Sequence, residues 1–224
     1  MYKTETHLHT SEVSSCSQLC GAEMVRLYRD AGYSTVFVSD HFKKNYLKDV
    51  DGMCWADVVH RYFLGYENAK RAGDELGIVV LPALEIQLTC SVNHYLLYGA
   101  DEAFYASAPE IFDMTPEQLY AYSKKNGVTV VQAHPYRDGK CIPTPECVDA
   151  IEAINANPRH ENFDEKALAM AREHGLPVTS GSDAHRLCDV ALGGVVTEDK
   201  INTTEDYVNA LLGGKLRLIG GDEV

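Results

Sequence analysis

The feature that most constrains the fold of this 224-residue chain is a regular alternation of short apolar runs with longer amphipathic stretches. Short apolar runs bounded by turn residues indicate strands, and apolar residues recurring at helical spacing indicate helices. The pattern predicts strands at 2–7, 34–41, 78–85, 128–134, 150–157, 177–185 and 216–221. It predicts helices at 20–32, 56–77, 115–127, 161–175 and 203–214. This alternation implies right-handed crossovers and a largely parallel sheet, which is the α/β class.

The number of strand and helix units favours a closed barrel over an open sheet. About seven such units suit a barrel, although a doubly wound sheet is an alternative. Against that alternative, no strand is followed by the glycine-rich GxGxxG or GxxxxGK[ST] loops that bind nucleotide phosphates. The stretch 86–98 differs in kind, because Ser91 and Asn93 lie between two apolar runs and predict a hairpin.

Composition and charge exclude several classes of protein. A hydrophobic content of 45% without a proline- or glycine-rich linker predicts one domain over 1–224. The 33 acidic and 20 basic residues give a net charge of -13, which argues against binding to duplex nucleic acid. The 7 cysteines form no CxxC pair, and we find neither an apolar leader nor an apolar run of membrane-spanning length. The sequence therefore predicts reduced cysteines and a cytoplasmic protein without membrane contact.

Imidazole and carboxylate side chains follow several predicted strands at their carboxyl ends. In parallel α/β folds these ends converge on one face, where active sites are assembled from several loops. A single histidine at such a place is more often an ordinary loop residue, but five strand ends together predict one metal-binding pocket. The residues concerned are His7, His9, Asp40, His41, Glu85, His134, Asp183 and His185, with His94 opening the second arm of the hairpin.

The two histidines of the segment ETHLHT have the spacing of a metal-binding pair. Residues two apart on a strand point to the same side, so the imidazoles of His7 and His9 can hold one ion. A mixed set of imidazole and carboxylate ligands suits zinc, manganese or iron better than calcium. His60 and His174 fall inside predicted helices and are expected to be surface or packing residues.

The motifs HLH, SDH, PALE, NHYLLYG, QAHP and GSDAH, in this order, resemble those of the PHP family, named for polymerase and histidinol phosphatase. The resemblance extends from His7 to His185 and on through the closing helix and strand. It implies a distorted (β/α)7 TIM-like barrel with two or three divalent metal ions that hydrolyses phosphate esters. The number of ions and the phosphate chemistry rest on this resemblance.

The resemblance also implies the ligands of each metal ion. The ligands implied for one ion are His7, His9, Glu85 and Asp183, and those for a second ion are Glu85 as a bridge, His94 and His134. His41 and His185 would belong to a third ion. Relatives carry a further histidine or aspartate soon after the HxH motif, and Glu12 is the candidate third-site ligand in this chain. Asp40 is expected to orient an imidazole.

The expected reaction is hydrolysis of a small phosphate monoester, a phosphorylated metabolite, by a hydroxide that the metal ions activate. An arginine would bind the phosphate through two parallel hydrogen bonds, and the order of preference is Arg137, Arg159, Arg186. The candidate catalytic residues are His41, Glu85, Asp183, His185 and Arg137.

Two other functions are compatible with parts of this pattern. Amidohydrolases acting on C–N bonds also carry HxH on a first barrel strand, but they commonly bridge their metals through a carbamylated lysine at a strand end. No lysine follows an apolar strand here, and Glu85 takes the bridging place. A non-catalytic, metal-stabilised PHP module is the other alternative, although such modules tend to lose ligands and every expected motif is present here.

Overall fold

The computed structural model describes residues 1–48 and 50–220. Helices and strands alternate along these residues, as the sequence pattern predicts. The strands are β1 (Tyr2–Leu8), β2 (Tyr33–Val38), β3 (His41–Lys43), β4 (Val79–Gln87), β5 (His94–Tyr98), β6 (Thr129–Ala133), β7 (Ala150–Asn155), β8 (Val178–Gly181), β9 (Gly194–Thr197) and β10 (Arg217–Ile219). The α-helices are α1 (Gly21–Asp30), α2 (Trp55–Leu76), α3 (Glu102–Ala106), α4 (Pro116–Lys125), α5 (Asp164–His174) and α6 (Thr204–Leu212).

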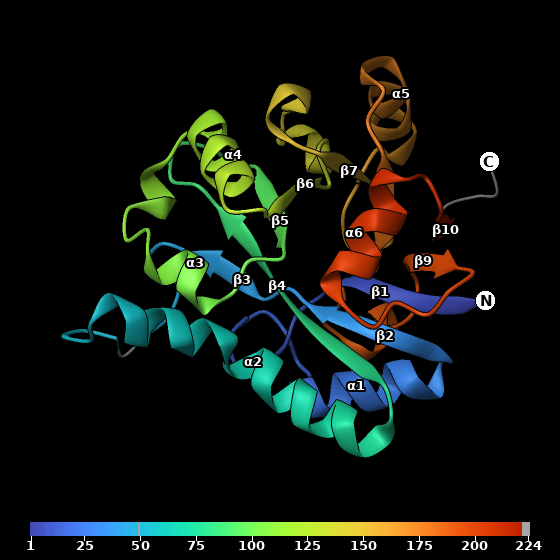
Figure 1. Cartoon of the computed structure of the whole chain (residues 1–224), viewed down its shortest axis with the longest axis horizontal. Helices are drawn as coiled ribbons and strands as arrows, with labels where there is room; N and C mark the ends of the chain where they lie inside the picture. Colours follow the sequence, from blue (N-terminus) through green and yellow to red (C-terminus); the bar gives the residue numbers. More distant parts are fainter. Residues whose placement is uncertain (49, 221–224) are drawn as a thin grey trace.

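The strands form one curved sheet in the order β10-β9-β1-β2-β4-β5-β6-β7-β8, with β3 beside the end of β4. The sheet nearly closes into a barrel, because β8 returns to β1. Thr6 Oγ1 donates to the carbonyl of Ser180 at 2.6 Å, and Leu8 forms an isolated parallel bridge with Ala184. Figure 1 shows α1 and α2 side by side on the outside of β1, β2 and β4. The predicted α/β barrel is thus confirmed.

Side chains alternate between the outside and the inside of the barrel along β4. Leu84 and Ile86 belong to the outer core under the helices, whereas Ala83 packs inward with Phe37 and with Tyr207 of α6. Since side chains of a strand alternate between its two faces, Glu85 shares the inward face with Ala83. The barrel interior is therefore apolar toward the amino ends of its strands and polar toward their carboxyl ends.

The structure departs from the predicted elements in several respects. The hairpin at 86–98 is present, but β5 pairs antiparallel with both β4 and β6. The short strands β3 and β9 were not predicted, and β9 pairs antiparallel with β1. The predicted strand 34–41 ends at Val38, so Asp40 lies in a connection. Residue 221 of the predicted strand 216–221 lies outside the described residues. None of the described helices is long and apolar enough to cross a membrane.

Candidate metal centre

The carboxyl ends of the strands bring imidazole and carboxylate groups to one buried place. His7 and His9 lie at the end of β1, Glu85 near the end of β4, and His134 directly after β6. His94 begins β5, and because β5 runs antiparallel its first residue lies at the same rim, opposite Gln87. We call this group the histidine–carboxylate cluster, and its members are His7, His9, His41, Glu85, His94, His134, Asp183 and His185.

The carboxylate of Glu85 lies at the centre of the cluster and contacts imidazoles from two sides. Its Oε1 atom lies 2.8 Å from His94 Nδ1 and 2.9 Å from His134 Nε2. Its Oε2 atom lies 2.5 Å from His41 Nδ1, and His7 Nε2 lies 3.6 Å from Oε1. This arrangement has the form of a carboxylate that bridges two metal sites.

The carboxylate of Asp183 serves the other side of the cluster. Its Oδ1 atom lies 3.0 Å from His9 Nε2 and 3.5 Å from His7 Nε2. Asp183 Oδ1 is buried but has no aligned hydrogen-bond donor among the described residues. His134 Nδ1 is also buried and also lacks a hydrogen-bond partner among these residues. Asp183 and His134 also have positive φ angles of 47° and 31°, which are uncommon for residues with side chains. Strained backbone at such positions is typical of functional sites.

Hydrogen bonds from outside the cluster fix the orientation of its imidazoles. His7 Nδ1 donates to Glu152 Oε1 at 2.8 Å, which leaves His7 Nε2 facing the cluster. His9 Nδ1 lies 3.3 Å from Ser14 Oγ, and Ser14 Oγ donates to Asp40 at 2.7 Å. Carboxylates behind imidazoles commonly fix the tautomer and the ring direction of metal ligands. Asp40 therefore acts on His9 through Ser14, in the orienting role expected from the sequence.

The charges within the cluster favour a cation. Burial raises the pKa of a carboxylate, but His94, His41 and His134 together outweigh it and hold the pKa of Glu85 well below its usual range. Arg137, His7 and His9 together likewise outweigh burial and hold the pKa of Asp183 well below its usual range. Burial lowers the pKa of His9 well below that of a free histidine. The neighbouring carboxylates outweigh burial and raise the pKa of His7 to about 10 and that of His41 to about 9. The buried carboxylates thus draw positive charge to their side, which protonated imidazoles or a bound cation can supply.

The donor atoms of the cluster fit divalent metal ions. His7 Nε2 and His9 Nε2 lie 3.1 Å apart. Two nitrogens bound to one tetrahedral ion at about 2.0–2.1 Å would lie about 3.3 Å apart. The lone pairs of two nitrogens at this separation repel each other unless a proton or a cation lies between them. Asp183 Oδ1, which lacks a hydrogen-bond partner, lies beside the same two nitrogens. His7, His9 and Glu85 form one potential ligand set, and His41, Glu85 and His94 form another.

Of the three candidate arginines, the structure brings Arg137 to the cluster. Its Nη2 atom donates to Asp183 Oδ2 at 2.6 Å and to Asn155 Oδ1 at 2.7 Å, and its Nε donates to Asn162 Oδ1 at 3.0 Å. Arg159 instead pairs with Asp189. Arg186 is exposed and follows His185.

Glu12 does not join the cluster, contrary to what its place after the HxH motif suggested. Both of its carboxylate oxygens accept from the backbone N–H of Gly21 at 3.0 Å, and Oε1 also accepts from Asn68. Gly21 is the first residue of α1, and a helix amino end offers unpaired N–H groups and a partial positive charge. The carboxylate therefore caps α1, which explains why it turns away from the histidines.

Replacing Glu12 by alanine should lower the free energy of unfolding by about 1 kcal/mol, as loss of a helix cap does. The melting temperature should fall by about 2–4 °C, and the metal content should not change. Glu173→Ala, at an exposed position of α5, is the matched control and should leave both quantities unchanged. Loss of metal in Glu12→Ala with unchanged stability would instead make Glu12 a ligand.

Several residues of this site had no motif to identify them. Glu152 lies within the apolar strand β7 and orients His7, and its Oε2 accepts from the backbone N–H of His134 at 3.1 Å. The one signal was a carboxylate inside an otherwise apolar strand, since such a group must find partners when buried. Asn155 and Asn162, which hold Arg137, gave no signal at all.

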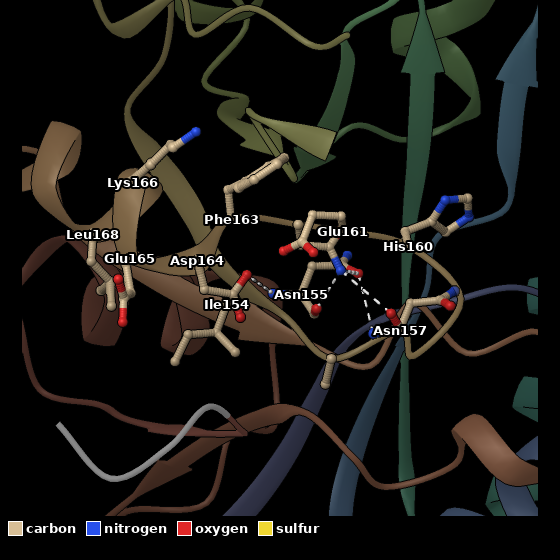
Figure 2. Close-up of a pocket in the computed structure, with 12 residues that line it drawn as sticks. Ile154, Asn155, Asn157, His160, Glu161, Phe163, Asp164, Glu165, Lys166 and Leu168 are labelled. Carbon is tan, nitrogen blue, oxygen red and sulfur yellow. Dashed lines mark hydrogen bonds between the residues drawn. The ribbon is translucent and has the colours of Figure 1, made fainter. Parts of the chain in front are cut away.

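A cavity of about 700 Å³ opens beside the cluster, between the end of β7 and the start of α5. Figure 2 shows Asn155, Asn157 and Asp164 lining it, and Asn162 also lines it. Asn155 and Asn162 lie between the cavity and Arg137, since they line the cavity and also hold the guanidinium, which does not line it itself. The cavity offers room for a small molecule with polar groups next to the cluster.

Comparisons with known proteins agree with this architecture. The model of a family described as PHP-associated matches residues 161–216, which run from the cavity to the residue before β10. None of the curated proteins compared with this chain matches its sequence. The resemblance to PHP proteins seen in the motifs is therefore supported by this segment.

Three solved structures share the fold over almost the whole chain. One is a two-domain protein from Bacteroides vulgatus that contains a predicted PHP-like metal-dependent phosphoesterase, and it is 16% identical with a TM-score of 0.71. The match covers 98% of this chain and 64% of the Bacteroides chain. An amidohydrolase from Chromobacterium violaceum, solved with bound sulfate and no metal, is 16% identical with a TM-score of 0.59. This match covers 96% of this chain and 97% of the amidohydrolase chain. The lesion-specific endonuclease from Pyrococcus furiosus is 12% identical with a TM-score of 0.60, and the match covers 99% of this chain and 59% of the endonuclease chain. The chain thus spans less than two thirds of the Bacteroides and Pyrococcus chains, and the likeness establishes the PHP-like barrel fold.

Proposed function

We propose that this chain, with its PHP-like barrel and PHP-associated segment, is a metal-dependent phosphoesterase that hydrolyses a small phosphate monoester. The observation that carries the proposal is the position of Glu85, whose two oxygens contact imidazoles on opposite sides. Glu85 would serve as a ligand shared by two ions, and a pair of ions would supply the charge stabilisation that displacement at phosphorus needs.

The candidate ligands divide between two ions that share Glu85, with zinc, manganese or iron as the ions expected. When bound, such ions neutralise charge on the phosphoryl oxygens and make water more acidic. The chain itself keeps the ligands oriented, since Glu152 holds His7 and Ser14 holds His9. The ligands proposed are His7, His9, Glu85 and Asp183 for one ion and Glu85, His94 and His134 for the other.

Arg137 is the group proposed to bind the phosphate. Its Nη2 and Nε atoms are used by Asp183, Asn155 and Asn162, while Nη1 donates to none of the described residues. The guanidinium is thus held in place by three partners and keeps donors available for a phosphoryl oxygen. Its contact with Asp183 also fixes that carboxylate, so Arg137 would position a ligand and the substrate together.

Phosphate ester chemistry is favoured here over C–N bond hydrolysis. The bridging place is taken by Glu85, and among the described residues the ion pairs of Glu85 and Asp183 are with histidines and Arg137, not with a lysine. A guanidinium beside the carboxylates also suits a doubly charged phosphate better than a neutral amide. The partner proposed is a small phosphorylated metabolite, whose organic part would occupy the cavity of about 700 Å³.

The proposal predicts phosphatase activity that depends on bound metal. Stripping the protein with a chelator should lower the rate on an aryl phosphate at least a hundredfold (~10²), because the ions supply several kcal/mol of transition-state stabilisation. Adding back zinc, manganese or ferrous iron should restore the rate. The same assay is run on a phosphodiester, on single-stranded DNA and on an anilide. Metal-dependent cleavage of the anilide alone, or of DNA alone, would replace the proposal, and inactivity on every compound by metal-loaded protein would make the chain a non-catalytic module.

A further inference from the structure

The short strand β3 carries a lysine on the inner face of the barrel. β3 runs parallel to β4, and its first residue, His41, lies opposite Glu85. Its last residue, Lys43, lies opposite Gln87. Side chains alternate between the two faces of a strand, and Phe42, between them, belongs to the outer core under the helices. His41 and Lys43 therefore share the inward face, with Lys43 two residues closer to the mouth of the barrel.

Lys43 belongs to a row of side chains that includes a member of the histidine–carboxylate cluster. Gln87 lies opposite Lys43 on one neighbouring strand and opposite His94 on the other. Residues paired across neighbouring strands lie side by side on one face of the sheet. His94 Nδ1 lies 2.8 Å from Glu85 Oε1, so a side chain from this row reaches the centre of the cluster. Lys43 is thus placed in the layer next to Glu85, on the side of the mouth.

The ammonium group of Lys43 lies near the cluster and forms no ion pair with a described residue. Its Nζ atom lies 5.8 Å from the centre of the Tyr46 ring, and that ring lies edge-on to the imidazole of His41 with 5.7 Å between the ring centres. The neighbouring Lys44 instead donates to the carboxylate of Asp113 at 2.6 Å. In a protein with a net charge of -13, a lysine at the mouth without a carboxylate partner suits an anionic ligand.

Lys43 and Arg137 lie on opposite sides of the barrel mouth. Arg137 is held by Asn155 at the end of β7 and by Asp183 after β8. The barrel strands follow the order β1-β2-β4-β5-β6-β7-β8, and β8 returns to β1. β4, with β3 at its end, is therefore three strands from β7 in one direction and three strands from β8 in the other. The two cations thus face the cluster from opposite walls.

We propose that Lys43 binds a phosphoryl oxygen of the substrate, from the wall of the barrel opposite Arg137. This inference rests on the proposed function. A lysine ammonium is a point charge on a flexible stem, whereas a guanidinium binds phosphate through donors in a fixed plane. The phosphate would then be oriented by Arg137 on one side and neutralised by Lys43 on the other, which fixes its position across the mouth.

The test measures the binding of inorganic phosphate to the metal-loaded full chain by titration calorimetry. Lys43→Met keeps an unbranched stem but removes the charge, and it should raise the Kd for phosphate about tenfold, as loss of one charged hydrogen bond does. Lys43→Arg should restore most of the affinity. Lys44→Met is the matched control, because it removes a cation that pairs with Asp113, and it should leave the Kd unchanged. The metal content should be the same in all variants, which separates phosphate binding from damage to the metal centre.

A second measurement uses only the unmodified protein, so it does not depend on the folding of a variant. Phosphate should slow the acetylation of Lys43 by acetic anhydride, measured by mass spectrometry, and should not slow that of Lys44. An unchanged Kd in Lys43→Met, or acetylation of Lys43 that phosphate does not slow, would overturn the proposal. Neither readout needs turnover, so a protein that binds phosphate through Lys43 but hydrolyses no phosphate ester would refute only the proposed function.

Discussion

Replacing Glu85 by glutamine should lower kcat/KM for a phosphate monoester about a thousandfold, the upper end of what losing one preorganised charged group costs an active site. The amide has nearly the same size and shape but carries no charge. It would also present an N–H₂ group to His41 on one side or to His94 and His134 on the other. Metal analysis and steady-state kinetics check this, and both the metal content and the rate should fall.

A matched control for this variant lies on the surface of the molecule. Glu67 faces His60 and Glu102 in a second grouping of histidine and carboxylates, but these side chains are largely exposed. Glu67→Gln should therefore leave metal content and rate unchanged. If Glu67→Gln lost metal and Glu85→Gln kept it, the metal site would lie at the surface grouping around Glu67 and not at the barrel mouth.

Replacing Gly65 by alanine should give the largest loss of stability, about 3 kcal/mol in the free energy of unfolding. Gly65 is buried in α2, where an added Cβ would come 2.0 Å from Thr10 Oγ1 and 2.3 Å from Asp40 Oδ2. Those two side chains are joined by a hydrogen bond of 2.6 Å, and Asp40 also accepts from Ser14. The helix would have to move outward or the pair would have to separate, and the melting temperature should fall by about 6–12 °C.

The same substitution should disturb the metal centre, because Asp40 orients His9 through Ser14. Thermal unfolding and metal analysis of Gly65→Ala are compared with those of Glu75→Ala, an exposed position on the same helix that should be neutral. An unchanged melting temperature in Gly65→Ala would mean that α2 does not press against Asp40 as the structure has it.

Much of the barrel could be predicted because its signals are local. The apolar runs and the stop signal at Gly77, which adopts φ 73° at the end of α2, follow from the residues of each segment alone. The strands β3 and β9 could not be predicted in this way. Each has four residues or fewer and is a strand only because β4 or β1 lies beside it.

The sequence by itself determined which residues can bind metal and that strand ends would carry them. The spacing of His7 and His9, and the carboxylates Glu85 and Asp183 after apolar runs, are properties of the chain and need no partner. The candidate ligands that the structure brings together were identified in this way, and their binding of metal stays a prediction.

Only the tertiary structure decided which of the candidate side chains reach the cluster. Glu12 lies in the connection after β1, and the resemblance to PHP proteins made it a candidate ligand of a third metal ion. The fold places the amino end of α1 next to Glu12, so the carboxylate binds an unpaired N–H group there. The fold likewise brings Arg137 to Asp183, whereas it pairs Arg159 with Asp189 instead. Such choices depend on which groups long-range packing brings within hydrogen-bonding distance, and the spacing of residues along the chain does not contain that information.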